Sequence, residues 1–138
     1  MRALLQRVSA ASVRCSGEQI AAIGPGLLIL LGVGAGDSAQ SAERLAGKVR
    51  TLRIFADSAG RMNEPLGDRE VLCVSQFTLY ADTRRGNRPS FSGAAEPGLA
   101  AALYERFCDA LDAKRGRFGE HMEVALVNDG PVTILLEL

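Results

Sequence analysis

Three residues with chemically useful groups occur close together in a mainly apolar segment, residues 71–80. They are Ser75, Gln76 and Thr78, with the apolar Phe77 among them. The segment is typical of a buried strand, in which successive side chains point to opposite faces, so Gln76 and Thr78 would share a face. A buried amide or hydroxyl without a hydrogen bond costs about 1 to 3 kcal/mol. The two side chains are therefore expected to bind each other or to face a ligand.

A second unusual segment reads Asn128-Asp129-Gly130-Pro131. Asparagine, aspartate and glycine tolerate the positive φ angles of tight hairpins, so these residues alone predict a hairpin turn. Proline restricts its own φ and removes a backbone donor from the start of the next strand. We therefore expect a rigid turn whose carbonyl groups point away from the neighbouring strand.

Other residues offer little for catalysis by protein side chains. His121 is the only histidine and would have to be the base of any triad, but it lies beside an expected strand, which favours a surface or strand-edge role. Cys73 lies among apolar residues, where a thiol behaves as a small hydrophobic group with a high pKa. The glycines of residues 32–36 follow an apolar run, but their spacing matches neither a dinucleotide-binding nor a phosphate-binding motif. They predict a tight strand-to-helix turn.

The charge of the chain is balanced, with 16 basic and 16 acidic residues among 138. No overall field therefore attracts nucleic acid. A local cluster of Arg84, Arg85 and Arg88 could bind a phosphate or two, although charge alone favours a solvated loop. The length fits one domain, residues 1–138, and hydrophobic residues make up 47% of the chain, enough for a substantial core.

The three cysteines are odd in number and far apart, which fits reduced thiols better than disulfides or a metal site. No apolar run approaches the roughly 18 residues of a membrane-spanning helix. The first residues also lack the apolar stretch of a signal peptide. We expect a cytoplasmic protein with no metal, no other cofactor and no membrane partner.

The apolar patterns predict an α+β domain of mainly antiparallel sheets layered with two helices. Residues 2–13, 18–23 and 27–31 are expected to pair as a meander. One helix is expected to begin at Asp37 or Ser38, and another near Glu96 and Pro97, because apolar residues then recur at helical spacing. The remaining predicted strands are residues 70–80, 122–127 and 132–138.

Short motifs distributed along the whole chain carry a family resemblance. They are Gln6-Arg7-Val8, Gly24-Pro25-Gly26-Leu27-Leu28, Leu52-Arg53-Ile54-Phe55, Met62-Asn63, Ser75-Gln76-Phe77-Thr78-Leu79-Tyr80-Ala81-Asp82, Arg88-Pro89-Ser90-Phe91, Gly116-Arg117-Phe118-Gly119 and Val127-Asn128-Asp129-Gly130-Pro131-Val132-Thr133. Together they resemble the D-aminoacyl-tRNA deacylases, also called D-tyrosyl-tRNA deacylases. The resemblance implies that family's fold.

The resemblance implies a homodimeric hydrolase that cleaves the ester between a D-amino acid and the terminal adenosine of tRNA. Such an enzyme proofreads chirality in translation, and its partner is the aminoacylated 3′ end of tRNA. The family's Gly-Pro peptide is cis and enters the pocket of the other subunit, so Gly130 and Pro131 would face the partner's residues 75–78. A stiff backbone wall there would exclude L side chains, whereas glycyl esters could pass.

The same resemblance distributes roles among the named residues. Ser75, Gln76, Phe77 and Thr78 would form the catalytic segment. Backbone N–H groups of Phe77 and Thr78 could stabilise the carbonyl oxygen, or the Thr78 hydroxyl could attack or orient water, and the terminal 2′-hydroxyl of tRNA would assist. Gln76 would hold the α-amino group or the adenosine.

The remaining residues concern chiral selection. Asn128, Gly130 and Pro131 would contribute to substrate binding and to the wall. Arg7 would brace the Gly-Pro unit, or would be a solvated strand residue. Two rival functions remain open: a non-catalytic dimeric module that binds RNA or nucleotides, and a structural dimer joined through the apolar C-terminal strand.

Overall fold

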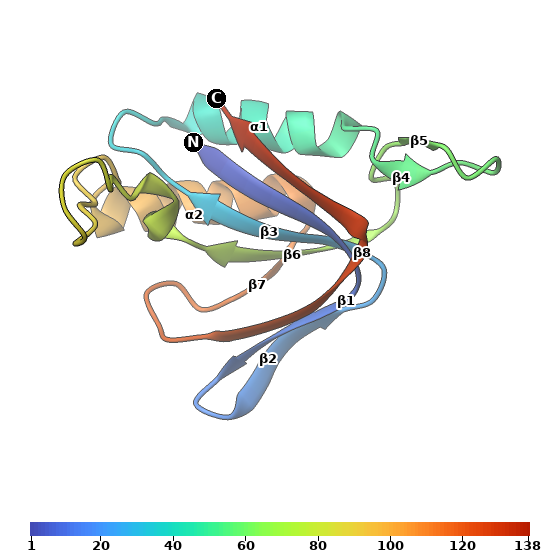
Figure 1. Ribbon diagram of the computed structural model, residues 1–138, viewed down its shortest axis with the longest axis horizontal. Helices are drawn as coiled ribbons and strands as arrows, with labels where there is room; N and C mark the ends of the chain where they lie inside the picture. The colour runs from blue at the N-terminus through green and yellow to red at the C-terminus, as the bar shows by residue number, and fades with distance from the viewer.

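Strand β1 (Arg2–Cys15) is the centre of the sheet in the computed structural model, which describes residues 1–138 (Figure 1). One edge of β1 pairs with β8 (Glu123–Glu137) along most of its length. Its other edge pairs first with β3 (Gly26–Gly32) and then with β2 (Glu18–Ile23). The predicted meander is wrong, because β3 pairs with β1 and not with β2.

The sheet continues beyond β3 through two parallel strands. The strand β6 (Glu70–Ser75) lies parallel to β3, and the short β7 (Lys114–Arg115) lies parallel to β6. A separate pair, β4 (Phe55–Ala56) and β5 (Met62–Glu64), forms a small antiparallel sheet. The predicted α+β class is confirmed, with a mixed main sheet.

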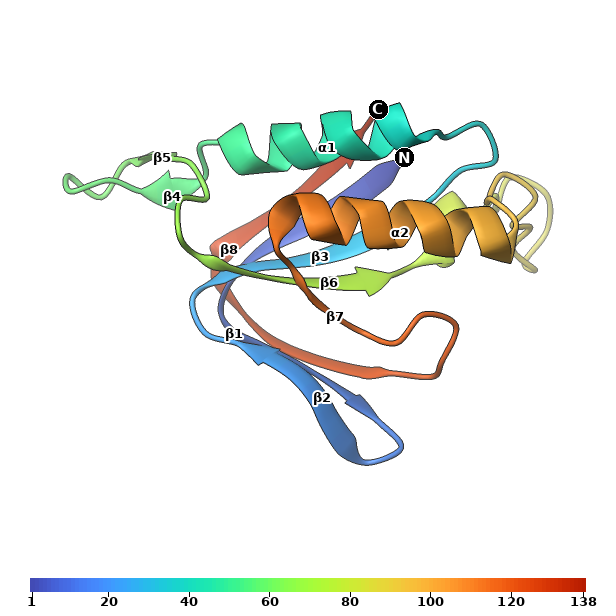
Figure 2. The ribbon, with the colours of Figure 1, turned by 180° about the vertical axis from the view of Figure 1, so that it is seen from behind.

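Two helices cover one face of this sheet, as Figures 1 and 2 show. The first, α1 (Ala39–Thr51), begins after Ser38, whose hydroxyl accepts a hydrogen bond from the Ser41 backbone in a capping box. The second, α2 (Pro97–Leu111), begins after Glu96, whose carboxylate accepts backbone hydrogen bonds from the first turn. Both predicted helices and both of their starts are confirmed.

The core lies on both faces of the sheet. The larger cluster joins α1 and α2 to Leu27, Ile29 and Leu31 of β3, and the smaller joins Leu28 to β1, β2 and β6. Because the sheet curls, its own strands cover the face that the helices leave free (Figure 1). A strand buried on both faces requires a continuous apolar run, which explains the sequence of β3.

The C-terminal segment forms one strand, β8, and not the two strands predicted. Thr133 pairs with Gln6 and Asn128 pairs with Val8, so residues 129–132 bulge outward opposite a single residue, Arg7. The predicted hairpin turn is wrong, because both flanks of the bulge pair with the same long strand and the chain keeps its direction. Proline fits there, since a bulge needs no ladder hydrogen bond from it.

The strand β6 ends at Ser75, five residues before its predicted end. Residues Phe77–Tyr80 form the short 3₁₀ helix η1. Gln76 still donates its N–H to the Leu31 carbonyl at 2.8 Å, and the chain turns immediately afterwards. The partner strand β3 ends at Gly32, so no further ladder holds the segment extended. No helix of the chain is both long enough and apolar enough to span a membrane.

Candidate active site

The segment after β6 places its polar side chains near the surface. Gln76 is half-buried and Thr78 is exposed, and every buried residue of the chain is apolar or aromatic. The expectation of a buried amide and hydroxyl on one strand face is therefore wrong. The two side chains were expected to bind each other or to face a ligand. In the single chain they bind each other, because Gln76 donates its side-chain N–H to the Thr78 hydroxyl.

Two glycines allow η1 to lie directly against the end of β3. A Cβ on Gly32 would lie 3.1 Å from both the Gln76 carbonyl oxygen and the Leu79 Cβ. A Cβ on Gly34 would lie 2.7 Å from the Tyr80 hydroxyl, closer than such atoms approach. The glycine-rich turn of residues 32–36 thus has a packing role toward the candidate site.

Tyr80 fixes the end of η1 from the other side. The Arg2 guanidinium lies 4.6 Å from the centre of the Tyr80 ring and donates a 2.7 Å hydrogen bond to the Leu79 carbonyl. Partial burial, with a smaller contribution from the nearby Asp37 carboxylate, raises the pKa of Tyr80 to about 12. The phenol is therefore uncharged at neutral pH, and its ring serves to position the segment.

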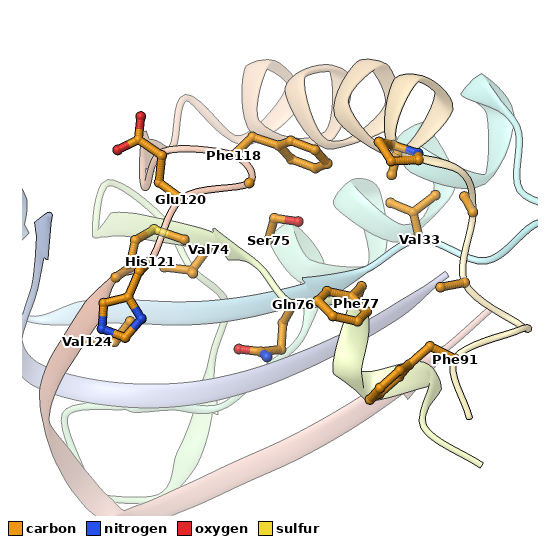
Figure 3. A pocket seen from close by; sticks show the side chains of 16 residues that line it. Val33, Val74, Ser75, Gln76, Phe77, Phe91, Phe118, Glu120, His121 and Val124 are labelled. Carbon is orange, nitrogen blue, oxygen red and sulfur yellow. The ribbon is translucent and has the colours of Figure 1, made fainter. Parts of the chain in front are cut away.

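A pocket of about 600 Å³ opens beside the end of β6. Ser75, Gln76 and Phe77 line it together with the start of α2, and Phe118 lies on the side of the helix (Figure 3). Phe77 contacts Phe91 edge to face, with ring centres 5.0 Å apart. Ten of the sixteen lining residues are hydrophobic, which suits a mostly apolar ligand.

The end of β6 is held from behind by α2. The buried Tyr104 hydroxyl donates a 2.8 Å hydrogen bond to the Cys73 carbonyl, which also accepts the Gly116 N–H at 3.0 Å. Burial raises the pKa of the Cys73 thiol well above its usual value, so the thiol stays protonated and is no nucleophile. His121 is exposed at the rim of the pocket just before β8, which confirms its predicted position.

The Gly-Pro unit occupies the bulge of β8, and its peptide bond is cis, as the resemblance implied. Arg7 holds this bulge: its Nε donates to the Asp129 carbonyl at 2.9 Å and its Nη1 to the Ile54 carbonyl at 2.6 Å. Only 15% of the Arg7 side chain is exposed. Of the two roles considered for Arg7, a brace for the Gly-Pro unit fits these contacts and a solvated strand residue does not.

Gly130 is required at its position by two independent facts. Its φ of +139° is one that L side chains rarely adopt. A Cβ there would also lie 2.8 Å from Cγ2 of Val132 and 3.0 Å from Nη2 of Arg7. The main chain at Gly130 therefore carries no side chain, and the Arg7 guanidinium group lies against it.

Asn128 stabilises the same bulge from within. Its side-chain oxygen accepts the Val132 N–H at 2.8 Å, and its side-chain nitrogen donates to the Thr133 hydroxyl at 2.9 Å. Both groups of the amide are thus used inside β8. These contacts join Asn128 to the residues that follow Pro131, and its expected part in substrate binding stays a prediction.

The two parts of the candidate site lie at opposite ends of the sheet within one chain. Arg7 pairs with Leu27 at the start of β3, whereas Ser75 pairs with Leu31 near its end. These positions are about 13 Å apart along the strand at about 3.3 Å per residue. Figure 1 shows the bend of β8 at the end of the sheet away from the segment that follows β6.

Sequence reasoning about chemistry missed the apolar wall of the pocket. Phe91 and Phe118 line it from loops that have no periodic pattern, and Met122 lines it from the position just before β8. An isolated aromatic residue in a loop gives no signal of which cavity it lines. Phe91 and Phe118 entered the sequence analysis only through the motifs that carried the family resemblance.

This fold, with its mixed sheet and two helices, also occurs in solved structures. A structure titled "c-Myc DNA Unwinding Element Binding Protein" superposes with a TM-score of 0.94 at 40% identity, covering 100% of this chain and 99% of that one. A structure described as a probable eukaryotic D-amino acid tRNA deacylase superposes with a TM-score of 0.86 over 99% and 98% of the two chains. At 16% identity, the second likeness concerns the fold alone.

Sequence comparison then defines the family. The family model described as D-Tyr-tRNA(Tyr) deacylase matches residues 4–137. A D-aminoacyl-tRNA deacylase of Roseiflexus castenholzii is 60% identical over 99% of this chain and 92% of its own length. One of Myxococcus xanthus is 54% identical over 99% and 94%. The chain belongs to the D-Tyr-tRNA(Tyr) deacylase family.

Proposed function

We propose that this protein is a hydrolase that removes D-amino acids from tRNA, and that residues 1–138 form its single catalytic domain. The observation that carries the proposal is the family match over residues 4–137, joined to an apolar pocket beside the segment from Ser75 to Thr78. In the reaction, water adds to the ester carbonyl and the bond to the ribose oxygen breaks. The ribose oxygen receives the proton, and free tRNA and D-amino acid leave.

The pocket fits the terminal adenosine of the substrate. Its volume of about 600 Å³ lies within the usual range of small-ligand sites, roughly 300 to 1,000 Å³. Phe77, Phe91 and Phe118 offer ring faces and edges, and unpaired bases commonly stack on such rings. An adenosine seated there has its ester at the mouth of the pocket, beside η1.

The main chain of η1 supplies the groups for charge stabilisation. The first N–H groups of a helix have no carbonyl partner within it, and in η1 these belong to Phe77 and Thr78. Two such donors aimed at a carbonyl oxygen stabilise the negative charge that develops during attack, with about 3 to 4 kcal/mol per donor as the upper range. The 2′-hydroxyl of the terminal ribose then assists the attacking water. Glu120 and His121 both line the pocket, but they form no hydrogen bond or ion pair with each other that would make them a paired acid and base.

Gln76 suits recognition of the α-amino group. Its side-chain N–H already donates to the Thr78 hydroxyl, which leaves its carbonyl oxygen as an acceptor. An ammonium group is a donor only, so the two match. The same contact orients the Thr78 hydroxyl. Whether this hydroxyl takes part in the chemistry is tested with the variant Thr78→Ala.

The complete site is proposed to form between two copies of the chain. The bulge at Gly130 lies far from the Ser75 to Thr78 segment in its own chain, and this separation supports the proposal that a second copy brings them together. Four of the six exposed large hydrophobic side chains lie on or directly after β8. These four, which suit burial between protomers, are Leu126, Val127, Leu135 and Leu138.

In this dimer the bare main chain at Gly130 and Pro131 acts as the chiral wall. The proline ring restricts its own φ, and Arg7 supports the unit from beneath. An L side chain collides with the wall, whereas a D side chain points away from it. Glycyl esters pass the same test, because glycine has no side chain. We place the enzyme in the cytoplasm, where its substrate is made.

The decisive experiment is to follow ester loss from D-tyrosyl-tRNA and from L-tyrosyl-tRNA with the purified protein. The proposal requires rapid loss of the D ester only, and binding without turnover would favour a non-catalytic RNA-binding module. The variant Thr78→Ala, compared with Thr51→Ala on α1, separates the hydroxyl from the backbone groups. A fully active monomer in analytical ultracentrifugation would contradict the shared site.

A further inference from the structure

The loop of residues 83–89, here called the arginine loop, projects from the protein beside the candidate site. All seven of its residues are exposed. Its base is closed, because Asp82 donates its N–H to the Ser90 carbonyl at 2.7 Å and accepts the Ser90 N–H at 3.0 Å. The loop is therefore a defined projection on a fixed stem.

The arginine loop carries positive charge that the protein does not neutralise. Arg84 pairs with Asp82 at 2.6 Å and lowers the pKa of that carboxyl. Arg85 and Arg88 take part in no ion pair and no side-chain hydrogen bond. Asp82 is the only acidic residue between Glu70 and Glu96. A chain with zero net charge thus concentrates two free guanidinium groups at one place.

This charge lies next to the pocket and not elsewhere on the surface. The loop begins three residues after Tyr80, the last residue of η1, and ends two residues before Phe91. The Phe91 ring contacts that of Phe77, with ring centres 5.0 Å apart. Phe77 and Phe91 both line the pocket, as Figure 3 shows. Both ends of the arginine loop are therefore attached to the wall of the proposed adenosine site.

We propose that Arg85 and Arg88 bind the phosphates of the nucleotides that precede the terminal adenosine of tRNA, an inference that rests on the proposed function. A single strand leaving the pocket carries one negative charge per nucleotide, and a guanidinium group matches a phosphate with two parallel hydrogen bonds. The arginine loop then supplies affinity for the nucleic acid, while the pocket and η1 act on the ester.

The test compares two substrates that differ only in phosphates. The double variant Arg85→Gln, Arg88→Gln should raise the KM for D-tyrosyl-tRNA several-fold and leave kcat within about twofold. D-Tyrosyl-adenosine has no phosphate, so its hydrolysis should proceed at the wild-type rate. The slope of log KM against log salt concentration for tRNA should fall by about 1.4, since a single strand contributes about 0.7 per phosphate contact.

The matched control is Arg44→Gln, Lys48→Gln on the exposed face of α1, which removes the same charge from residues that form no ion pair. It should behave as wild type with both substrates. An unchanged KM and salt slope for tRNA in the loop variant would overturn the inference. So would an equal loss on D-tyrosyl-adenosine, because the loop would then act on the pocket. Failure of the wild type on both substrates would instead refute the proposed function.

Discussion

Replacing Arg7 by alanine tests the support beneath the Gly-Pro unit. The guanidinium group donates hydrogen bonds to two carbonyl groups, those of Asp129 and Ile54. Hydrogen bonds from charged groups contribute about 1.5 to 3 kcal/mol each. Water can replace the bond to the exposed Asp129, but Ile54 is buried. We therefore expect the free energy of unfolding to fall by one such bond, about 1.5 to 3 kcal/mol.

Urea unfolding followed by circular dichroism measures this loss, since the chain contains no tryptophan. With a slope of about 1 to 3 kcal/mol per molar urea, the midpoint should fall by about 1 M. Protein concentration must be equal in all samples, because assembly adds to apparent stability. Arg14→Ala in the same strand is the control: its guanidinium hydrogen bonds only to the nearby exposed Gly17, so the change should stay within about 0.5 kcal/mol.

The same variant should lose discrimination between D-tyrosyl-tRNA and L-tyrosyl-tRNA, because the wall is no longer fixed. The readout is the ratio of kcat/KM for the two esters, which Arg14→Ala should leave unchanged. If Arg7→Ala unfolds at the wild-type midpoint and rejects the L ester as before, Arg7 does not brace the Gly-Pro unit, and its hydrogen bonds to the Asp129 and Ile54 carbonyls do not stabilise the fold.

Three further outcomes are expected. Gly34→Ala should lower deacylation by displacing Tyr80, whereas Gly36→Ala, which meets no atom within 4 Å, should not; equal rates would argue against positioning of η1 by this turn. Gly130→Ala should cost about 1 to 3 kcal/mol of stability in urea unfolding, given its φ of +139° and the contact with Val132, and a neutral result would contradict that packing. The raised pKa of Tyr80, about 12, means that the protonated phenol stabilises the fold below its unfolded pKa near 10, a contribution lost as pH rises to 12. Unfolding free energies across that range should decline less steeply in Tyr80→Phe.

The helices could be predicted because their signals are local. Ser38 and Glu96 cap their own first turns, and the apolar residues that follow recur at helical spacing. The length of β6 could not be predicted, because residues 71–80 remain apolar beyond the point where the partner strand ends. Pairing between distant strands set that boundary.

The candidate site was predictable only in part for the same reason. The residues of η1 and of the bulge stand out by type, but the contact of Arg7 with Asp129 spans 122 positions in the sequence. The residues alone favoured a hairpin at 128–131, since nothing local reveals that both flanks pair with one long strand. The proposed arrangement of two chains could not be predicted from any pattern within the sequence of one chain.

The bulge in β8 and a smaller irregularity in β1 together preserve the phase of the two strands. β8 has three residues in excess between Asn128 and Thr133, and β1 has one in excess, Ser9, between Val8 and Ala10. From Gln6 to Ala10, β1 advances by four residues, while β8 advances by six between their partners, Val127 and Thr133. The excess of two is even, so alternating side chains keep their orientation on both sides. Deleting or inserting one residue there would exchange the two faces of one half of β8, so that its inward side chains would point outward. A change of two residues would alter only how far the bulge projects.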